Sequence, residues 1–225
     1  MDSLKNKKIL ITAGPTWVPI DDVRVISNTS SGELGLLLAR EALKYKAKVD
    51  LFLGPVPQAV LLNKNIRISR FEYFSELMDM VVLALRSKKY DYIFHCAAVS
   101  DYVTKKISGK ISSENNELVV RLKRAPKIID MIRKMNPDAF LVMFKLEGAV
   151  KDPVLLKRAL EAMNKVGADL VVANRFLSFK RRSKVSVRED KRYRGFILGP
   201  CGIFARALSR KALAVELLKL INKAN

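Results

Sequence analysis

Short apolar runs alternate with amphipathic segments along most of the chain. The apolar runs end at glycine, proline or small polar residues, which is typical of strands buried on both faces of a sheet. The amphipathic segments carry apolar residues three and four positions apart, as helices packed on one side do. The predicted strands are 8–12, 49–53, 66–68, 90–96, 140–144 and 170–173, and the predicted helices are 33–45, 73–86, 128–134, 153–166 and 209–222. This alternation predicts an α/β fold: a doubly wound, Rossmann-like, mainly parallel sheet with helices on both faces.

Two stretches depart from the parallel pattern. Residues 117–122 alternate between apolar and polar positions and predict an antiparallel or edge strand. Residues 184–188 and 194–198 predict a late β-hairpin. The chain shows no internal repeat and no convincing linker, so residues 1–225 are expected to form a single domain. The hydrophilic segment at about 101–116 predicts a flap over a binding site.

Polar clusters follow the ends of several predicted strands, where ligands bind in doubly wound sheets. The strongest cluster lies in 9–35, ILITAGPTWVPIDDVRVISNTSSGELG, which breaks at Gly14-Pro15 and enters a helix through NTSSG. Small residues let an anion approach the free N–H groups of a helix N-terminus. An ordinary strand–turn–helix joint with Ser30 or Ser31 as the N-cap explains the same spacing, so both interpretations stay open. The segment contains neither GxxxxGK[ST] nor GxGxxG.

The formal net charge is +20, from 42 Lys and Arg against 22 Asp and Glu. Three explanations of this positive charge are possible, and the basic residues are spread along the whole chain. Scattered surface charge is therefore the favoured explanation, a site for anionic small molecules is the second, and nucleic-acid binding is the third. No apolar run is long enough to span a membrane and no signal-peptide core opens the chain, so a soluble cytoplasmic protein is expected. Two cysteines, Cys96 and Cys201, and the single His95 favour neither a disulfide framework nor a Cys/His metal site.

Six motifs resemble those of the phosphopantothenoylcysteine synthetases of coenzyme A biosynthesis, in the same order. They are the TAGPT…PID.VR.ISN.SSG..G opening (Thr12–Gly35), CAAVSDY (Cys96–Tyr102), KISS (Lys110–Ser113), APKII (Ala125–Ile129), FKLE (Phe144–Glu147) and ADLVVAN (Ala168–Asn174). The resemblance implies that a nucleoside triphosphate activates the carboxylate of 4′-phosphopantothenate as an acyl-nucleotide, with release of pyrophosphate. The amine of L-cysteine then attacks to form phosphopantothenoylcysteine and a nucleoside monophosphate.

The resemblance also implies roles for individual residues. Asn28 matches the asparagine that contacts the acyl group and its activated intermediate, and Lys110 matches a flap lysine that neutralises phosphate charge. Asp101 matches a nucleotide contact that could help hold Mg²⁺, and no metal ligand is assigned beyond it. The nucleotide-site matches are Gly14, Ser30, Gly32, Gly35, Cys96, Ala97, Asp101, Pro126, Lys127, Ile128, Ile129, Phe144 and Asn174. The side chains of Cys96 and His95 are interpreted as packed strand-end residues.

The implied co-substrates are Mg²⁺ with CTP or ATP. KISS and FKLE are similar to the stand-alone members of the family, which favours CTP without deciding the question. Many members are fused to a flavin-dependent decarboxylase that is absent from this sequence, so no flavin is expected. The resemblance implies a homodimer with the hairpin at about 184–198 in its interface, and neither a membrane nor a nucleic acid as partner.

Three rival functions remain. A nucleotide-dependent oxidoreductase would share the fold, but it needs a glycine fingerprint after the first strand and an acid at the end of the second, where Asp50 lies too early. A basic nucleic-acid-binding protein would show steeply salt-dependent binding. A catalytically inactive scaffold would keep the fold and lose the chemistry.

Overall fold

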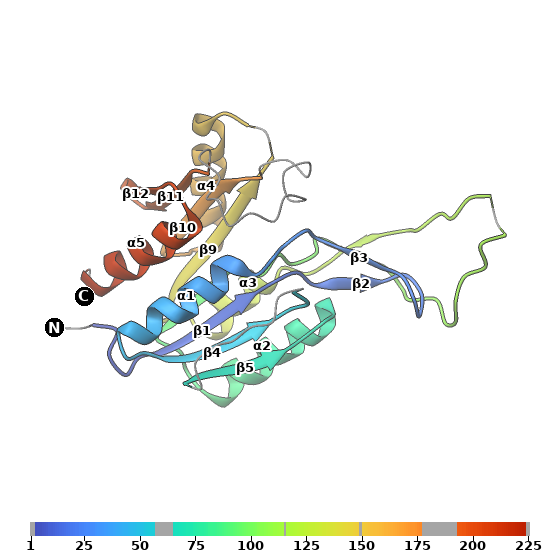
Figure 1. The fold of residues 1–225 in the computed structure, drawn as a ribbon, viewed down its shortest axis with the longest axis horizontal. Helices are drawn as coiled ribbons and strands as arrows, with labels where there is room; N and C mark the ends of the chain where they lie inside the picture. Colours follow the sequence, from blue (N-terminus) through green and yellow to red (C-terminus); the bar gives the residue numbers. More distant parts are fainter. Residues whose placement is uncertain (1–2, 57–64, 115, 149, 177–192, 224–225) are drawn as a thin grey trace.

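A twisted eight-stranded sheet forms the centre of the computed structural model, which describes residues 3–56, 65–114, 116–148, 150–176 and 193–223 (Figure 1). The strand order is β12-β11-β10-β9-β6-β1-β4-β5. Neighbours from β10 to β5 pair in parallel, and β11 and β12 pair antiparallel. The strands are β1 (Lys8–Ala13), β4 (Lys48–Leu53), β5 (Ile66–Arg70), β6 (Tyr92–His95), β9 (Phe140–Glu147), β10 (Leu170–Arg175), β11 (Gly195–Gly199) and β12 (Gly202–Ala207).

Helices cover both faces of this sheet. Helices α1 (Glu33–Lys44) and α5 (Arg210–Lys223) pack on one face, while α2 (Phe74–Ser87), α3 (Ile128–Met135) and α4 (Asp152–Val166) pack on the other. Successive strand residues alternate between the two cores: Ile9 and Ile11 face α1 and α5, whereas Leu10 faces the opposite layer. The predicted doubly wound, mainly parallel α/β fold is confirmed.

The direction of winding reverses between β1 and β6. The chain runs from β1 to β4 and β5 on one side, then returns to β6, β9 and β10 on the other. Loops leaving the carboxyl ends of two strands diverge at such a switch point, which opens room for a ligand. The loops that begin at Gly14 and at Cys96 leave the sheet there.

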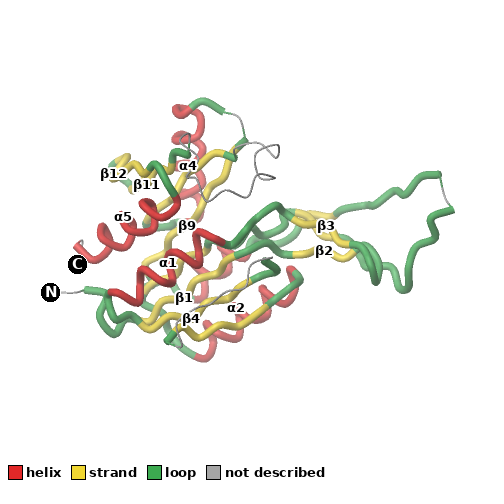
Figure 2. Tube along the Cα trace, in the orientation of Figure 1, coloured by secondary structure: helices red, strands yellow, loops and turns green. Residues whose placement is uncertain are grey.

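An arm projects from this edge of the sheet (Figures 1 and 2). We define it as residues 17–27 and 101–124, of which 115 is not described. It contains two small antiparallel pairs, β2 (Trp17–Pro19) with β3 (Val25–Ser27) and β7 (Tyr102–Val103) with β8 (Lys123–Arg124). At its base the backbone N–H of Trp17 donates to the carbonyl of Glu72 at 2.7 Å, and the Trp17 ring meets that of Tyr73 edge-on.

The predicted late hairpin is present, and two other local predictions need correction. Residues 194–198 fall almost entirely within β11, which pairs with β12, and residues 184–188 lie outside the described part of the chain. Strand β12 shows no apolar alternation because most of its side chains are exposed. Residues 117–122 form no strand, since only Lys123 and Arg124 pair with β7. The N-cap of α1 is Gly32 rather than Ser30 or Ser31.

Within the described residues, no helix combines the length and the apolar character that crossing a membrane requires.

Candidate active site

The loops after β1 and β6 hold each other together beyond the ends of their strands. The backbone N–H of Ala98 donates to the carbonyl of Gly14 at 2.9 Å, and that of Thr16 donates to the carbonyl of Ala98 at 3.3 Å. The hydroxyls of Thr16 and Ser100 are 3.1 Å apart, and both residues are buried. The switch point therefore has a fixed floor of backbone and small side chains.

Asn28 ties a third segment to this floor. Its side-chain nitrogen donates to the carbonyls of Ala98 and Val99, each at 3.1 Å. Two carbonyl acceptors fix the orientation of the amide, because the opposite orientation would set oxygen against oxygen. The amide oxygen is therefore the Asn28 atom left to face a ligand. The segments after β1, after β3 and after β6 therefore meet at the switch point.

Glycines at this edge occupy positions that no other residue fits well. Gly14 and Gly32 have φ angles of 83° and 68°, in the left-handed region that favours glycine. A Cβ on Gly32 would lie 3.4 Å from the nitrogen of Gly14, and one on Gly14 would lie 3.1 Å from that of Gly54. Three chain segments thus approach one another at backbone distance beside the N-terminus of α1, where N–H groups lack partners within the helix. This arrangement suits an anion.

We call the backbone around Gly14 and Gly32 the cradle. Ser30 and Gly35 support it in different ways. The hydroxyl of Ser30 accepts from the backbone N–H of Gly32 at 3.3 Å, so it shapes the turn that enters α1. A Cβ on Gly35 would lie 2.3 Å from the Cβ of Ala13. Gly35 therefore allows α1 to lie directly on β1, which is a packing role that does not depend on a nucleotide.

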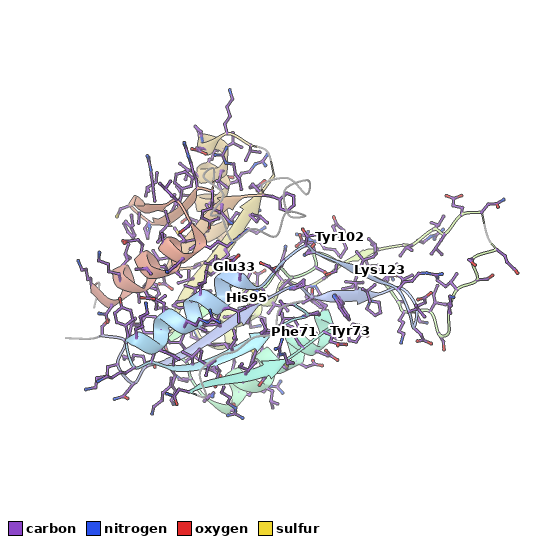
Figure 3. The ribbon with its side chains drawn as sticks, in the orientation of Figure 1. Glu33, Phe71, Tyr73, His95, Tyr102 and Lys123 are labelled. Carbon is purple, nitrogen blue, oxygen red and sulfur yellow. The ribbon has the colours of Figure 1, made fainter. Side chains whose placement is uncertain are left out.

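Thr12, His95 and Ala97 form a buried network beneath the switch point. The Thr12 hydroxyl lies 2.9 Å from Nδ1 of His95 and also accepts from the backbone N–H of Ala97 at 3.3 Å. Burial lowers the pKa of His95 to about 4, so the ring is neutral near pH 7. Figure 3 places His95 at the end of the sheet, on the side of the α1 N-terminus. A neutral histidine bonded to the β1 strand has a structural role.

Cys96 follows His95 as the first residue of the loop after β6. Burial raises the pKa of its thiol to about 12, against the weaker opposing effects of Arg210 and the backbone N–H of Gly35. The side chain is a thiol rather than a thiolate near pH 7 and makes a poor nucleophile. Its backbone N–H donates to the carbonyl of Thr12 at 3.0 Å, which agrees with a packed strand-end position.

Asp101 and Lys127 form an exposed ion pair where the arm meets α3. The backbone N–H of Ala125 donates to the carbonyl of Asp101 at 2.9 Å, which brings the APKII segment beside the CAAVSDY loop. Ile128 is buried against α2 and α4, so only its backbone can face a ligand. Pro126, two residues earlier, is exposed. Ile129 is half-buried on the same layer.

Phe144 and Asn174 come from the neighbouring strands β9 and β10. Phe144 packs on the α1 and α5 face of the sheet, opposite the layer that buries Ile128. Asn174 is half-buried near the end of β10, where it pairs with Leu146 and Gly195. Both residues lie toward the same carboxyl edge of the sheet as the loops after β1 and β6. They lie on the face of the sheet opposite to the one that α3 covers.

Lys110 is not beside Asn28. Trp17 pairs with Ser27 at the base of the β2–β3 hairpin, next to Asn28, and Pro19 pairs with Val25 at its far end. Lys110 lies against the turn beyond that far end, since Gly109 and Ile111 bond to Asp22 and Asp21. The two predicted catalytic residues are therefore separated by the length of the hairpin, about 10 Å at the rise of a strand.

Several residues at this edge escaped the sequence interpretation. Arg210, at the start of α5, donates to Glu33 in the first turn of α1 at 2.9 Å, and its guanidinium lies 5.6 Å from the centre of the Tyr193 ring. Arg210 therefore offsets the negative charge of Glu33 at the N-terminus of α1, an end of the helix that favours anions. Glu33 and Arg210 are 177 positions apart, and only the topology of the sheet brings them together.

Asp21, Asp22 and Arg24 form a second overlooked group, at the β2–β3 turn. Their spacing within PIDDVR is the signal that was present in the sequence, because aspartates at such positions bond their own turn. Within the described ranges, no three His, Cys, Asp or Glu side chains are grouped as a metal site would require.

The chain is similar in sequence to a known protein family and to curated proteins. Residues 4–222 match the model of the DNA/pantothenate metabolism flavoprotein C-terminal domain. A coenzyme A biosynthesis bifunctional protein, CoaBC, from Thermococcus kodakarensis is 37% identical over 178 residues, which cover 79% of this chain and 43% of that protein. This chain therefore matches less than half the length of that relative.

Two solved structures share the fold over nearly the whole chain. The DNA/pantothenate metabolism flavoprotein from Streptococcus pneumoniae has a TM-score of 0.83 at 26% identity, over 97% of this chain and all of that one. The C-terminal domain of a CoaBC protein has a TM-score of 0.77 at 25% identity, over 100% of this chain and 98% of that domain.

Proposed function

Because this chain belongs to the DNA/pantothenate metabolism flavoprotein C-terminal domain family, as its resemblance to phosphopantothenoylcysteine synthetases indicated, we propose that it is a phosphopantothenate–cysteine ligase. The relatives' names place them in coenzyme A biosynthesis. The substrates proposed for this chain are 4′-phosphopantothenate, L-cysteine and a nucleoside triphosphate.

The observation that carries the proposal is the convergence of Asn28 with the two left-handed glycines at the switch point. The close backbone approach at Gly14 and Gly32 leaves room for a triphosphate at the positive end of α1. Asn28 is fixed on the floor beside it by Ala98 and Val99. An anion site next to an oriented amide is what a reaction that joins a carboxylate to a nucleotide requires.

The proposed chemistry runs in two steps. A carboxylate oxygen of phosphopantothenate attacks the α-phosphorus, and the bond to the β-phosphate oxygen breaks to release pyrophosphate. The amine of cysteine then attacks the acyl carbon, loses a proton, and displaces the nucleoside monophosphate. The protein's contribution is to align the reactants and to stabilise charge that develops on them.

Asn28 has a defined share in this scheme. Because its nitrogen donates to two backbone carbonyls, its oxygen can accept an N–H from the attacking amine. Donation from the amide nitrogen to the acyl carbonyl would require those backbone hydrogen bonds to open. Either way the residue acts on the acyl step rather than on nucleotide affinity.

Mg²⁺ is proposed to arrive with the triphosphate as part of the co-substrate. Asp101 is the residue proposed to assist it, and its carboxylate is paired with Lys127. CTP is preferred to ATP on the sequence comparison only. Phe144, on the α1 and α5 face, is the proposed wall of the base site.

Pyrophosphate release tests the proposal directly. Purified protein is incubated with 4′-phosphopantothenate, L-cysteine and Mg²⁺, and separately with CTP and with ATP. The expected result is release that depends on phosphopantothenate, and the faster nucleotide identifies the natural one. Absence of release with either nucleotide from a folded protein would overturn the ligase assignment.

A homodimer is proposed alongside the activity. Large apolar side chains are exposed along the arm, which is the pattern of an interaction surface. They are Val23, Val25, Ile26, Tyr102, Ile107, Leu118, Val119 and Leu122. The interface first expected at 184–198 lies mostly outside the described residues and stays a prediction.

A further inference from the structure

The β2–β3 turn contains a buried carboxylate that does more than close its own turn. Asp21 is 2% exposed, and one of its oxygens accepts from the backbone N–H groups of Val23 at 2.9 Å and Arg24 at 2.7 Å. The other oxygen reaches across to the flap and accepts from the backbone N–H of Ile111 at 3.1 Å. The Arg24 guanidinium bonds that same oxygen at 2.7 Å and the carbonyl of Ile111 at 3.2 Å.

Asp22 holds the flap on the other side of Lys110. One carboxylate oxygen accepts from the backbone N–H of Gly109 at 2.8 Å, and the backbone N–H of Asp22 donates to the carbonyl of Gly109 at 3.2 Å. The other oxygen pairs with Lys106 at 2.6 Å. The residues immediately before and after Lys110 are therefore both anchored to adjacent aspartates of one turn.

The backbone at this point is also shaped to present Lys110. Gly109 has a φ of 76°, so the chain turns sharply immediately before the lysine. The side chain of Lys110 is exposed, and among the described residues its ammonium forms no ion pair. The flap is thus held rigidly where the lysine branches off, while the lysine itself points to solvent.

The charges of the anchor cancel and leave that of Lys110. Asp21 and Asp22 contribute −2, and Arg24 and Lys106 contribute +2. Burial alone would raise the pKa of Asp21, but hydrogen bonds from Val23, Ile111 and Arg24 and the Arg24 charge hold it at about 2. The bond from Lys106 lowers the pKa of Asp22. Both carboxylates remain ionised throughout the neutral range, so the anchor is permanent rather than pH-switched.

We propose that Asp21 and Asp22 are positioning residues, which together clamp the flap at Gly109 and Ile111 and so set the place of Lys110 for the reaction. This inference rests on the proposed ligase function, in which Lys110 neutralises phosphate charge. A flap clamped at this point presents one uncompensated cation from a fixed base. Loss of the clamp lets that cation sample many positions, and misplacement of about 1 Å can lower a rate about 100-fold.

Two measurements on Asp22→Ala test the clamp, and Asp22 is chosen because it is exposed and its removal spares the buried Asp21. The first is amide hydrogen exchange of a peptide containing Gly109 and Ile111, which requires no activity. The wild type should protect these amides, and Asp22→Ala should lose the protection at Gly109. Asp22→Asn keeps an acceptor for Gly109 and should retain most of it.

The second measurement is turnover in a double-mutant cycle with Lys110→Ala. Asp22→Ala should lower kcat about 10-fold to 100-fold, and adding it to Lys110→Ala should change kcat less than twofold further. Asp22→Asn should recover part of the loss. Lys105→Ala removes an exposed cation from the same flap without touching the clamp, and it should keep wild-type kcat.

The outcomes separate the clamp from the ligase assignment. Multiplying losses in the double variant, or unchanged exchange at Gly109 in Asp22→Ala, would overturn the clamp even if the wild type is an active ligase. Normal protection at Gly109 with no pyrophosphate release by the wild type would instead overturn the ligase function and, with it, the role given to Lys110.

Discussion

Asn28 shows how a single side chain can be both an anchor and a reactive contact. Its nitrogen joins the segment after β3 to the loop after β6 through Ala98 and Val99. Its oxygen takes no part in these two bonds and is left for a ligand. Removing the side chain should therefore loosen the floor slightly and remove the contact to the acyl step entirely.

We expect Asn28→Ala to lower the rate of amide formation about 100-fold or more, the loss typical of one oriented polar group at a reacting centre. Binding of the nucleotide, measured by calorimetry, should change only a few-fold, because the Gly14 and Gly32 cradle remains. Asn28→Asp is the matched variant. It keeps the shape but sets a carboxylate against two carbonyl oxygens, and it should be no more active than Asn28→Ala. Wild-type turnover in Asn28→Ala would remove this residue from the chemistry.

The sequence predicts the proximity of some of these residues and not of others. Asn28, Gly14 and Gly32 could be placed together because contiguous motifs carried them to strand ends. The ion pair of Glu33 with Arg210 could not, because residues 177 positions apart meet only after the sheet is assembled. The orientation of the Asn28 amide could not be predicted from the sequence either, since it depends on carbonyl groups of a distant loop.

At the scale of elements, α1 lies so close to β1 that one methyl group matters. A helix interior normally gains about 1 kcal/mol when glycine is replaced by alanine. At Gly35 the new Cβ would lie 2.3 Å from that of Ala13, so the two elements would have to separate.

We expect Gly35→Ala to lower the free energy of unfolding by about 1–3 kcal/mol, the usual cost of overpacking. Urea denaturation measures it. Gly148→Ala is the control, because a Cβ there meets nothing within 4 Å. A gain in stability in Gly35→Ala would mean that α1 is farther from β1 than the structure places it.

The Thr12–His95 bond makes the joining of β1 and β6 sensitive to acid. The pKa of His95 is lowered from 6.5 to about 4, so the unfolded chain binds a proton in a range where the folded chain does not. The stability linked to this group is therefore full above about pH 6.5 and is lost as the pH falls toward 4. A shift of this size corresponds to about 3 kcal/mol.

The test compares urea denaturation of the wild type and His95→Asn at pH 7 and at pH 4.5. Asparagine can bond Thr12 from the position of Nδ1 and carries no titrating group. The wild type should lose about 2–3 kcal/mol more than the variant between the two pH values. Equal losses would show that His95 is not buried as a neutral ring.

Elements with an apolar period were the ones the sequence predicted well. The five helices and the parallel strands around β1 were found because each buries a stripe or a run of apolar residues. The pairs β2–β3 and β7–β8 and strand β12 were not found. Strands β3, β8 and β12 expose most of their side chains and leave no such period, while β2 and β7 are only three and two residues long. The false strand at 117–122 has the opposite cause: its alternation is real, but among the described residues no strand pairs with it.

At the scale of the whole molecule, exposed large apolar side chains gather on the arm, although the body exposes some as well, Leu83 among them. Val119 and Leu83 are each 70% exposed, but Val119 lies among other exposed apolar residues of the arm, whereas Leu83 projects from α2 on the body. An interface between two copies would need the cluster and not the isolated residue.

We therefore expect the wild type to sediment as a dimer at micromolar concentration and Val119→Asp to sediment as a monomer, because a buried, unpaired carboxylate opposes association. Leu83→Asp adds the same charge at the same exposure and should remain dimeric. If the reverse occurs, with Leu83→Asp dissociating and Val119→Asp intact, the arm is not the interface. A dimer that survives both substitutions would direct attention to residues 184–198. Because the clamp at Asp21 and Asp22 lies on the same arm, a monomer with normal Gly109 protection would show that the flap is positioned within one chain.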